Sequence, residues 1–297
     1  TDWIEQNSWR TCHRGTVDLN ALLGAMGRDE VKGIAPVTAS WGHSKVCQAN
    51  TDTTIHVITG LSEFERLYKD VQDIVSASRD ERFGLPRAMM RLQWIARDLW
   101  DLVAPVGFYQ LVSGHDTSVR DLIERLRRSV PNNAWEQKVF SSTLPFAVEK
   151  LLTLHDLISR RKLPPRAAVL TRILDSALSD PTATALVLTP NRKSALAVAT
   201  WLYPEVSKRF GEPIRVRVEA LQEYVKSQQT ALSAETPFSH AIISSPLPRR
   251  HVSILFGRLG NHIHFICHSD EHRLVRATLA RVQYYKRTTE SSWTTML

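Results

Sequence analysis

The chain has 297 residues, of which 43% are hydrophobic and 23% charged, so it is long enough for two ordinary domains with packed cores. No apolar run approaches the roughly 18 residues of a membrane-spanning helix, and the start shows no signal-peptide pattern. Three cysteines are too few for a disulfide framework, so we expect a cytoplasmic protein with no membrane partner. Because the chain begins with Thr1 rather than Met, we expect a processed chain or a piece of a longer one.

The net charge of +8 is unevenly distributed along the chain. Residues 160–297 hold 20 Lys and Arg against 10 Asp and Glu, whereas residues 1–159 hold 18 against 20. All of the positive excess therefore lies in the second half. A basic half joined to a near-neutral one favours a polyanionic partner, DNA or RNA, although many mildly basic proteins have none.

The first third of the chain gives one clear α/β signal. Residues 1–54 show no sustained period, but Ile55–Thr59 is a short β-rich run that ends at Gly60. Residues 61–77 then repeat apolar side chains at helical spacing. The pattern predicts a strand, a turn and a helix.

Residues 86–159 are predicted to be mostly helical because apolar residues recur at three- and four-residue spacing. Asp116 or Thr117 could cap one of these helices, and Asn133 or Ala134 could begin another. The pattern leaves open whether this region is a separate helical subdomain or a helical insertion within an α/β domain.

The clearest boundary is the charged and then proline-rich stretch Arg160–Pro165, since two prolines do not fit inside a helix. We therefore predict a mixed, mostly helical region over residues 1–160, with a short α/β unit, and an α/β domain over residues 161–297.

Beyond this boundary, predicted helices and strands alternate regularly. Continuous apolar runs typical of buried strands occupy residues 184–190, 240–245 and 262–267, and the alternating run 214–218 suggests an edge strand. Helices are expected at 167–178, 194–210, 222–231 and 271–285, with a frayed tail from Arg287. The alternation predicts an α/β fold with a largely parallel sheet.

The order of these segments resembles the second RecA-like domain of a superfamily 2 helicase over residues 162–286. The strand Ala185–Pro190 is followed by a helix that starts Asn191-Arg-Lys-Ser-Ala195, and Phe256-Gly-Arg-Leu-Gly260 precedes the last strand. The resemblance implies a RecA-like sheet and a catalytic arginine, Arg258, that would reach the γ-phosphate of ATP.

The sequence departs from the helicase pattern in two places. The Gly-Arg motif lacks a glutamine and a second arginine, and Ser244-Ser245 is followed by Pro246 rather than an acidic residue. The resemblance is thus to a degenerate module, of a kind found in bacterial DNA-processing and phage-defence (antiviral) assemblies.

No G-x-x-x-x-G-K-[ST] phosphate-binding loop occurs in the chain, so we expect no complete ATPase site. Any ATP and Mg²⁺ would be shared with another domain or subunit. The leading hypothesis is a nucleic-acid-binding helicase-like module in a larger machine. The alternatives are a non-catalytic scaffold or adaptor that kept the fold, and a hydrolase or nuclease.

Basic residues follow two of the predicted buried strands. Ligands of open α/β sheets bind at the carboxyl ends of strands, and helix N-termini attract anions. The residues Arg192, Lys193, Arg249, Arg250 and Arg258 could therefore form one basic rim for phosphates or nucleic acid. Five separately solvated charges explain the pattern equally well.

Two clusters could suggest metal binding, but we predict no metal site. The first contains His240, His262, His264 and His268, which no nuclease-type carboxylate motif accompanies, so structural histidines are favoured. The second contains Cys12, His13, His43 and Cys47, where the spacing is unlike that of zinc sites and unrelated side chains are favoured.

Overall fold

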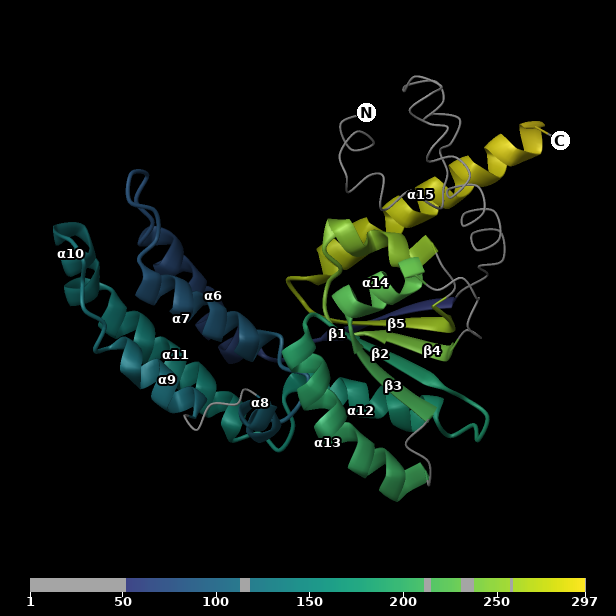
Figure 1. Cartoon of the computed structure of the whole chain (residues 1–297), viewed down its shortest axis with the longest axis horizontal. Coiled ribbons are helices and arrows are strands. Elements are labelled where there is room, and N and C mark those ends of the chain that lie inside the picture. Colours follow the sequence, from purple (N-terminus) through teal and green to yellow (C-terminus); the bar gives the residue numbers. More distant parts are fainter. Residues whose placement is uncertain (1–51, 113–117, 211–214, 231–237, 257–258, 297) are drawn as a thin grey trace. The chain divides into compact units, whose positions relative to one another are not determined.

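A computed structural model describes residues 52–112, 118–210, 215–230, 238–256 and 259–296 (Figure 1). The chain forms two compact units. The sheet unit takes the described residues of Thr1–Val57, Ile173–Arg192 and Phe210–Leu297, and the helical unit takes Ile58–Arg172 and Lys193–Arg209. The cysteine and histidine cluster at residues 12–47 lies outside the described residues.

The sheet unit contains five strands in the order β1-β5-β4-β2-β3. Their bounds are β1 Asp52–Ile58, β2 Ala185–Thr189, β3 Val216–Ala220, β4 Phe238–Ile243 and β5 Gly260–His268. β2 pairs in parallel with β3 and β4, and β4 pairs in parallel with β5. The α/β prediction is confirmed, the largely parallel sheet is consistent with a RecA-like fold, and β3 is an edge strand as its alternation predicted.

The sheet reverses its winding direction between β2 and β4. From β2 the chain moves outward to β3, and it then returns to form β4 on the other side of β2. Open α/β sheets bind ligands at the carboxyl ends of the strands on either side of such a switch point. The register, in which Val187 lies between Val218 and Ile242, fixes which residues reach that edge.

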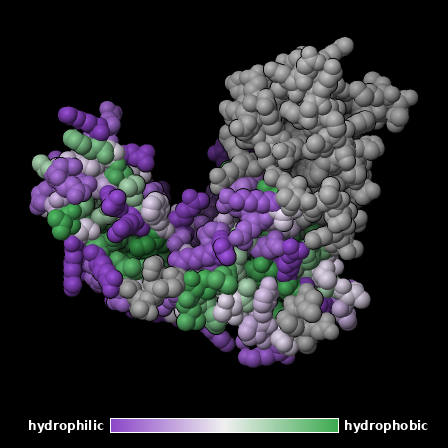
Figure 2. All heavy atoms as spheres, in the orientation of Figure 1, coloured by the Kyte–Doolittle hydropathy of each residue, from purple (hydrophilic) through white to green (hydrophobic). Residues whose placement is uncertain are grey.

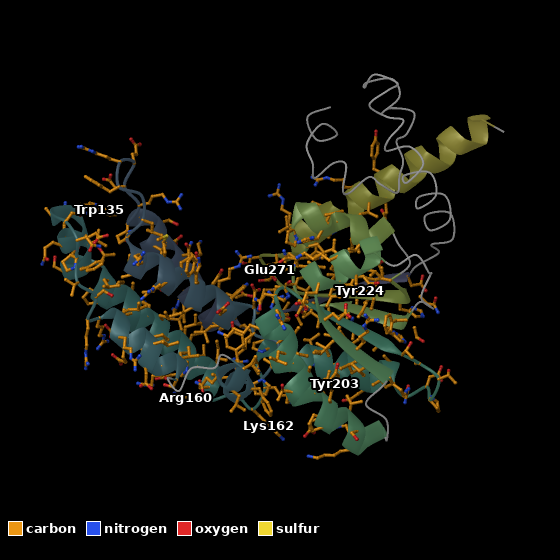
Figure 3. The ribbon with its side chains drawn as sticks, viewed as in Figure 1. Trp135, Arg160, Lys162, Tyr203, Tyr224 and Glu271 are labelled. Atoms are coloured by element: carbon orange, nitrogen blue, oxygen red, sulfur yellow. The ribbon has the colours of Figure 1, made fainter. Side chains whose placement is uncertain are left out.

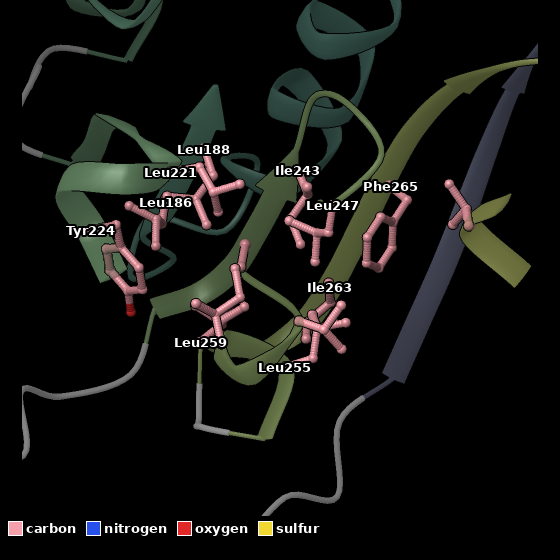
Figure 4. Close-up of a cluster of buried hydrophobic side chains, with 14 of the residues drawn as sticks. Leu186, Leu188, Leu221, Tyr224, Ile243, Leu247, Leu255, Leu259, Ile263 and Phe265 are labelled. Atoms are coloured by element: carbon pink, nitrogen blue, oxygen red, sulfur yellow. The ribbon is translucent and has the colours of Figure 1, made fainter. Parts of the chain in front are cut away.

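One face of the sheet carries a buried hydrophobic core (Figure 4). Alternate residues of the central strands point into it, including Leu186, Leu188, Ile243, Ile263 and Phe265. The core is covered by α14 (Leu221–Thr230), the 3₁₀ helix η2 (Arg249–Phe256) and α15 (His272–Met296). Burying each of these large side chains stabilises the fold by roughly 1.5–3 kcal/mol relative to exposing it.

The helical unit is built around α11 (Leu144–Ser159), whose apolar residues are buried on nearly every turn. Its other elements are α6 Ser62–Ala77, α7 Arg87–Trp100, α8 Val106–Val112, α9 Val119–Leu126, α10 Ala134–Ser142, most of α12 Pro165–Ala177 and most of α13 Arg192–Phe210. α11 packs against α6, α7, α9 and α10. The rings of Phe64 and Tyr68 stack on Trp100, with centroid separations of 4.9 and 4.2 Å, and join α6 to the end of α7.

The predicted boundary near residue 160 falls inside the helical unit, where it links α11 to α12. The prediction that this boundary separates two independently folding domains stays a prediction. Arg166, on the first turn of α12, is fully buried and donates from Nη2 to Asp101 Oδ1 at 3.2 Å. This ion pair anchors the link to the end of α7.

No helix in the described part of the chain combines the length and the apolar character needed to cross a membrane.

Candidate functional site

Most of the buried polar side chains described in the sheet unit lie near the carboxyl ends of its strands, which we call the carboxyl edge of the sheet. They are Thr189 at the end of β2, Ser244 and Ser245 after β4, His251 in η2 and His268 at the end of β5. Each is at most 8% exposed. Burying a polar group without a partner is costly, so such groups collect where a fold binds something or ties its own loops together.

Thr189 ties two strands together at this edge. Its hydroxyl lies 3.1 Å from the carbonyl oxygen of Asn191 and 3.3 Å from that of Glu219, so it can donate to either. The first contact holds the turn into α13, and the second joins the end of β2 to β3. Thr189 therefore shapes the switch point.

Glu271 likewise stabilises the turn that follows β5 (Figure 3). Its Oε2 accepts a hydrogen bond from the backbone N–H of His268 at 2.9 Å, and its own N–H donates to the His268 carbonyl at 3.1 Å. The last helix, predicted to begin at residue 271, begins one residue later, because α15 starts at His272.

The predicted basic residues Arg192 and Lys193 turn to different neighbours, each within its own unit. The Arg192 side chain is 86% exposed, and its Nε lies 3.6 Å from Glu223 Oε1. Lys193 Nζ lies 4.1 Å from the centre of the Tyr109 ring. Burial lowers the pKa of Lys193, and the nearby Asp98 opposes this effect.

The remaining predicted residues are only partly described. The backbones of Arg249 and Arg250 belong to η2, at the carboxyl side of β4, and Arg258 lies outside the described residues. The grouping of these arginines with Arg192 and Lys193 into one rim stays a prediction.

The aromatic ring of Tyr109 lies beneath the Lys193 ammonium. Burial raises the pKa of Tyr109, and the negative charge of Asp98 and a hydrogen bond to it raise the pKa further. The phenol therefore stays protonated and donates to Asp98. A neutral ring held this way presents its face to the Lys193 ammonium, an arrangement worth about 0.5–2 kcal/mol.

Histidines from three neighbouring strands form a hydrogen-bonded row. His56 Nε2 lies 3.1 Å from His264 Nδ1, and His264 Nε2 lies 3.1 Å from His240 Nδ1. The rings of His240 and His262, which are cross-strand partners, stack at 5.0 Å. Among the described residues, no three His, Cys, Asp or Glu side chains are placed to hold a metal ion.

Burial lowers the pKa of His264 to about 4, and the charges that His56, His240 and His262 can carry lower it further. Burial, followed by His262, also lowers the pKa of His240. At neutral pH these two rings are uncharged, and each can donate one bond and accept another. The prediction of satisfied structural histidines is confirmed for His240 and His264. His56 was missed because it belongs to a strand far away in the sequence, and His268 lies apart at the carboxyl edge.

The helical unit holds a pocket of about 390 Å³ between the start of α8 and the end of α11. Its lining is partly apolar, including Val106 and Ile158. Arg161 and Lys162 line its charged side, and Lys162 is labelled in Figure 3. The positive charges of Arg161 and Lys162 suit a small anion. The sequence did not predict this pocket, because it is formed by two segments that lie 50 residues apart in the chain.

No family model and no curated protein matches the sequence. Among solved structures, the chain is similar to the Hef helicase domain of Pyrococcus furiosus, with 9% identity and a TM-score of 0.47, covering 82% of this chain and 62% of that one. It is also similar to the C-terminal part of the Fun30 ATPase domain, with 11% identity, a TM-score of 0.37 and coverage of 74% and 86%.

The chain thus spans less than two thirds of the Hef helicase domain. At such low identities and TM-scores, these likenesses carry no argument about function.

Proposed function

We propose that this chain is a helicase-like module that binds nucleic acid within a larger ATP-dependent DNA-processing or defence machine of the bacterial cytoplasm. The observation that carries the proposal is the switch point between β2 and β4, where buried polar side chains lie and Arg192 begins α13. This is the edge at which open α/β sheets bind ligands. The net positive charge of the second half of the chain supports a polyanionic ligand.

In this proposal, the chain lacks a complete ATPase site of its own. The sequence contains no phosphate-binding loop, so ATP and Mg²⁺ would be held mainly by another domain or subunit. The carboxyl edge of the sheet would face that partner, and Arg258 would contribute transition-state charge from this side.

Binding of labelled single strands and duplexes at low salt tests the proposal. We expect the quadruple variant Arg192→Gln, Lys193→Gln, Arg249→Gln, Arg250→Gln to weaken binding several-fold, because each lost cation removes a phosphate contact. A matched control neutralises exposed arginines in other places, such as Arg172 and Arg276. Failure of the wild-type chain to bind any strand would overturn the proposal.

A non-catalytic scaffold is the second candidate, and a specific observation favours it. Thr189 and Glu271, two polar residues of the carboxyl edge, are engaged in backbone hydrogen bonds that hold turns. Gly260 of the helicase-like motif is needed for strand packing, because a Cβ there would lie 2.9 Å from Phe238 O. An ATPase assay with and without DNA, on the chain joined to its partner, separates a motor from a scaffold.

A further inference from the structure

The outward face of α7 carries an unusual stripe of side chains. Arg87, Arg91, Trp94 and Arg97 follow one another at spacings of four, three and three residues, which places them on one side of a helix. All four are exposed. The opposite side of α7 is buried, through Ala88, Met89, Leu92, Ala96 and Leu99. The bundle thus fixes α7 in place while this set, the α7 stripe, faces solvent.

The charges of the α7 stripe are largely unmatched. Arg97 lies 3.6 Å from Asp101 Oδ2, but its side chain is 74% exposed. Within the described part of the chain, neither Arg87 nor Arg91 has an ion pair or side-chain hydrogen bond, and α7 has no acidic residue before Asp98. Elsewhere in the unit, Arg120 pairs with Asp156 at 2.6 Å and Lys150 with Asp70 at 3.1 Å.

Trp94 is the second distinctive part of the stripe. It is 63% exposed, more than any other tryptophan described, and no aromatic or cationic neighbour covers its ring among the described residues. A single exposed apolar residue needs no special explanation. A tryptophan set among three exposed arginines, two of them without an ion pair in the described part of the chain, combines a stacking surface with positive charge. This is the combination that strand-binding proteins use.

We infer that the α7 stripe binds single-stranded nucleic acid, with a base stacked on the Trp94 indole and neighbouring phosphates contacted by Arg87, Arg91 and Arg97. Ten residues of helix separate Arg87 from Arg97, a length of about 15 Å that suits a short stretch of strand. Stacking on an exposed ring requires an unpaired base, so a duplex is a poorer ligand. This inference rests on the proposed function and adds a binding surface outside the sheet unit.

Two other partners fit the stripe less well. An anionic membrane would require an apolar face to insert, and the apolar face of α7 is buried within the bundle. An acidic peptide would satisfy the arginines, but its carboxylate side chains carry no aromatic ring to stack on Trp94. Hydrophilic side chains dominate the visible face of the helical unit, with apolar ones among them (Figure 2).

Equilibrium binding of a labelled single strand, in DNA and RNA versions, tests the inference. Trp94→Ala should weaken single-strand binding roughly 5- to 100-fold, whereas Trp94→Phe should retain most of it because a ring remains. Duplex binding should change less than about threefold. Arg87→Gln with Arg91→Gln should lower the slope of log Kd against log salt by about 1.4, since each phosphate contact contributes about 0.7.

The matched controls are Arg128→Gln and Phe146→Ala, which remove an exposed arginine and an exposed aromatic ring of the same unit away from α7. Both should bind like wild type, and thermal melting confirms that every variant is folded. A photoreactive strand, cross-linked and digested with trypsin, should label the peptide Leu92–Arg97, which contains Trp94.

The outcomes separate the two proposals. If wild type binds single strands and Trp94→Ala binds them equally well, the inference that the α7 stripe binds single strands is wrong, and the proposed function stands. If the controls lose as much affinity as the stripe variants, or if Trp94→Ala weakens duplex binding as much as single-strand binding, the stacking role is overturned. If wild type binds no nucleic acid, even at low salt, both proposals fail.

Discussion

At the scale of single residues, Gly260 shows how a motif glycine can be explained by packing. It begins β5, directly beside β4, and a Cβ there would lie 2.9 Å from Phe238 O and 3.1 Å from Ala241 N. Both of these atoms belong to the backbone, so they can move away only if the strands separate. The sequence indicated that this glycine belongs to a helicase-like motif. In the structure, the close approach of β5 to β4 explains why a glycine is needed here, without any role in nucleotide binding.

We predict that Gly260→Ala lowers the free energy of unfolding by roughly 1–3 kcal/mol, as overpacking commonly does. Urea unfolding measures the change. Gly107→Ala is the control, because a Cβ at that position on α8 would have nothing within 4 Å. The control should be neutral or stabilised by up to about 1 kcal/mol. Equal stability of Gly260→Ala and wild type would contradict the close approach of β5 to β4.

The histidine row gives a prediction for pH. His264 has a pKa of about 4 in the fold, against 6.5 when unfolded, so the unfolded chain binds a proton more tightly. The contribution of His264 to stability is therefore complete above pH 6.5 and is lost as the pH falls from 6.5 towards 4. After allowance for the partial exposure of the ring, we expect a loss of about 1–2 kcal/mol.

The variant His264→Asn isolates this effect. Carboxylates such as Asp156 and Asp180, whose pKa values are lowered by hydrogen bonds, remain in both proteins and cancel in the comparison. The difference in unfolding free energy between wild type and variant should shrink between pH 6.5 and pH 4. A constant difference across this range would show that His264 titrates normally.

At the scale of elements, local sequence patterns identified the strands and helices well but placed their ends less accurately. β2 lies within the predicted apolar run, and β3 begins at Val216, which its register pairs with Ala185. Residue 214, where the β3 run was predicted to begin, lies outside the described residues. The α9 helix is capped by Ser118, whose Oγ accepts from Asp121 N at 3.1 Å. The predicted caps, Asp116 and Thr117, lie outside the described residues.

The two other helix ends show where local signals succeed and fail. Asn133 caps α10 as predicted, and its side chain accepts from Glu136 N. The expected frayed tail from Arg287 is wrong, since α15 continues to Met296. The Ser and Thr residues there lower helix propensity by only a few tenths of a kcal/mol each, and no Gly or Pro ends the helix.

The start of α12 gives an element-scale prediction. Arg166 is fully buried, and its Nη2 lies 3.2 Å from the carboxylate of Asp101, which is 15% exposed. Arg166→Met should lower stability by roughly 3–5 kcal/mol, because it removes the buried guanidinium and leaves this carboxylate only the exposed Arg97, 3.6 Å away. Chemical unfolding measures the loss, and Arg172→Met, an exposed position on the same helix, is the control. A small effect at Arg166 would mean that α12 does not depend on this ion pair.

At the scale of the whole molecule, the alternation of strands and helices was sufficient to predict an α/β fold with a largely parallel sheet. The membership of β1 was not predicted, because more than 120 residues separate it from β2 and no local pattern records such a pairing. The sequence left open whether the helical region is a separate subdomain or an insertion within an α/β domain. In the structure, helices α6 to α11 lie in the chain between β1 and β2 of one sheet, as an insertion does.

The candidate site was predicted in outline only. The carboxyl ends of β2 and β4 do meet at a switch point, as parallel pairing requires. The contacts of individual basic side chains could not be predicted, because Glu223 beside Arg192 and Tyr109 beneath Lys193 come from distant segments. For the same reason, the sequence did not distinguish Arg87, Arg91 and Trp94 on α7 from other solvated charges and apolar residues.

The central claim, that this chain binds nucleic acid through its positive charge, is tested most directly by one titration. The dissociation constant for a labelled single strand is measured between 50 and 200 mM salt. We predict that it rises more than about tenfold, with a log–log slope of about 2 or more, because several condensed counterions are released. Absence of binding at 50 mM salt, or an affinity that does not change with salt, would contradict the claim.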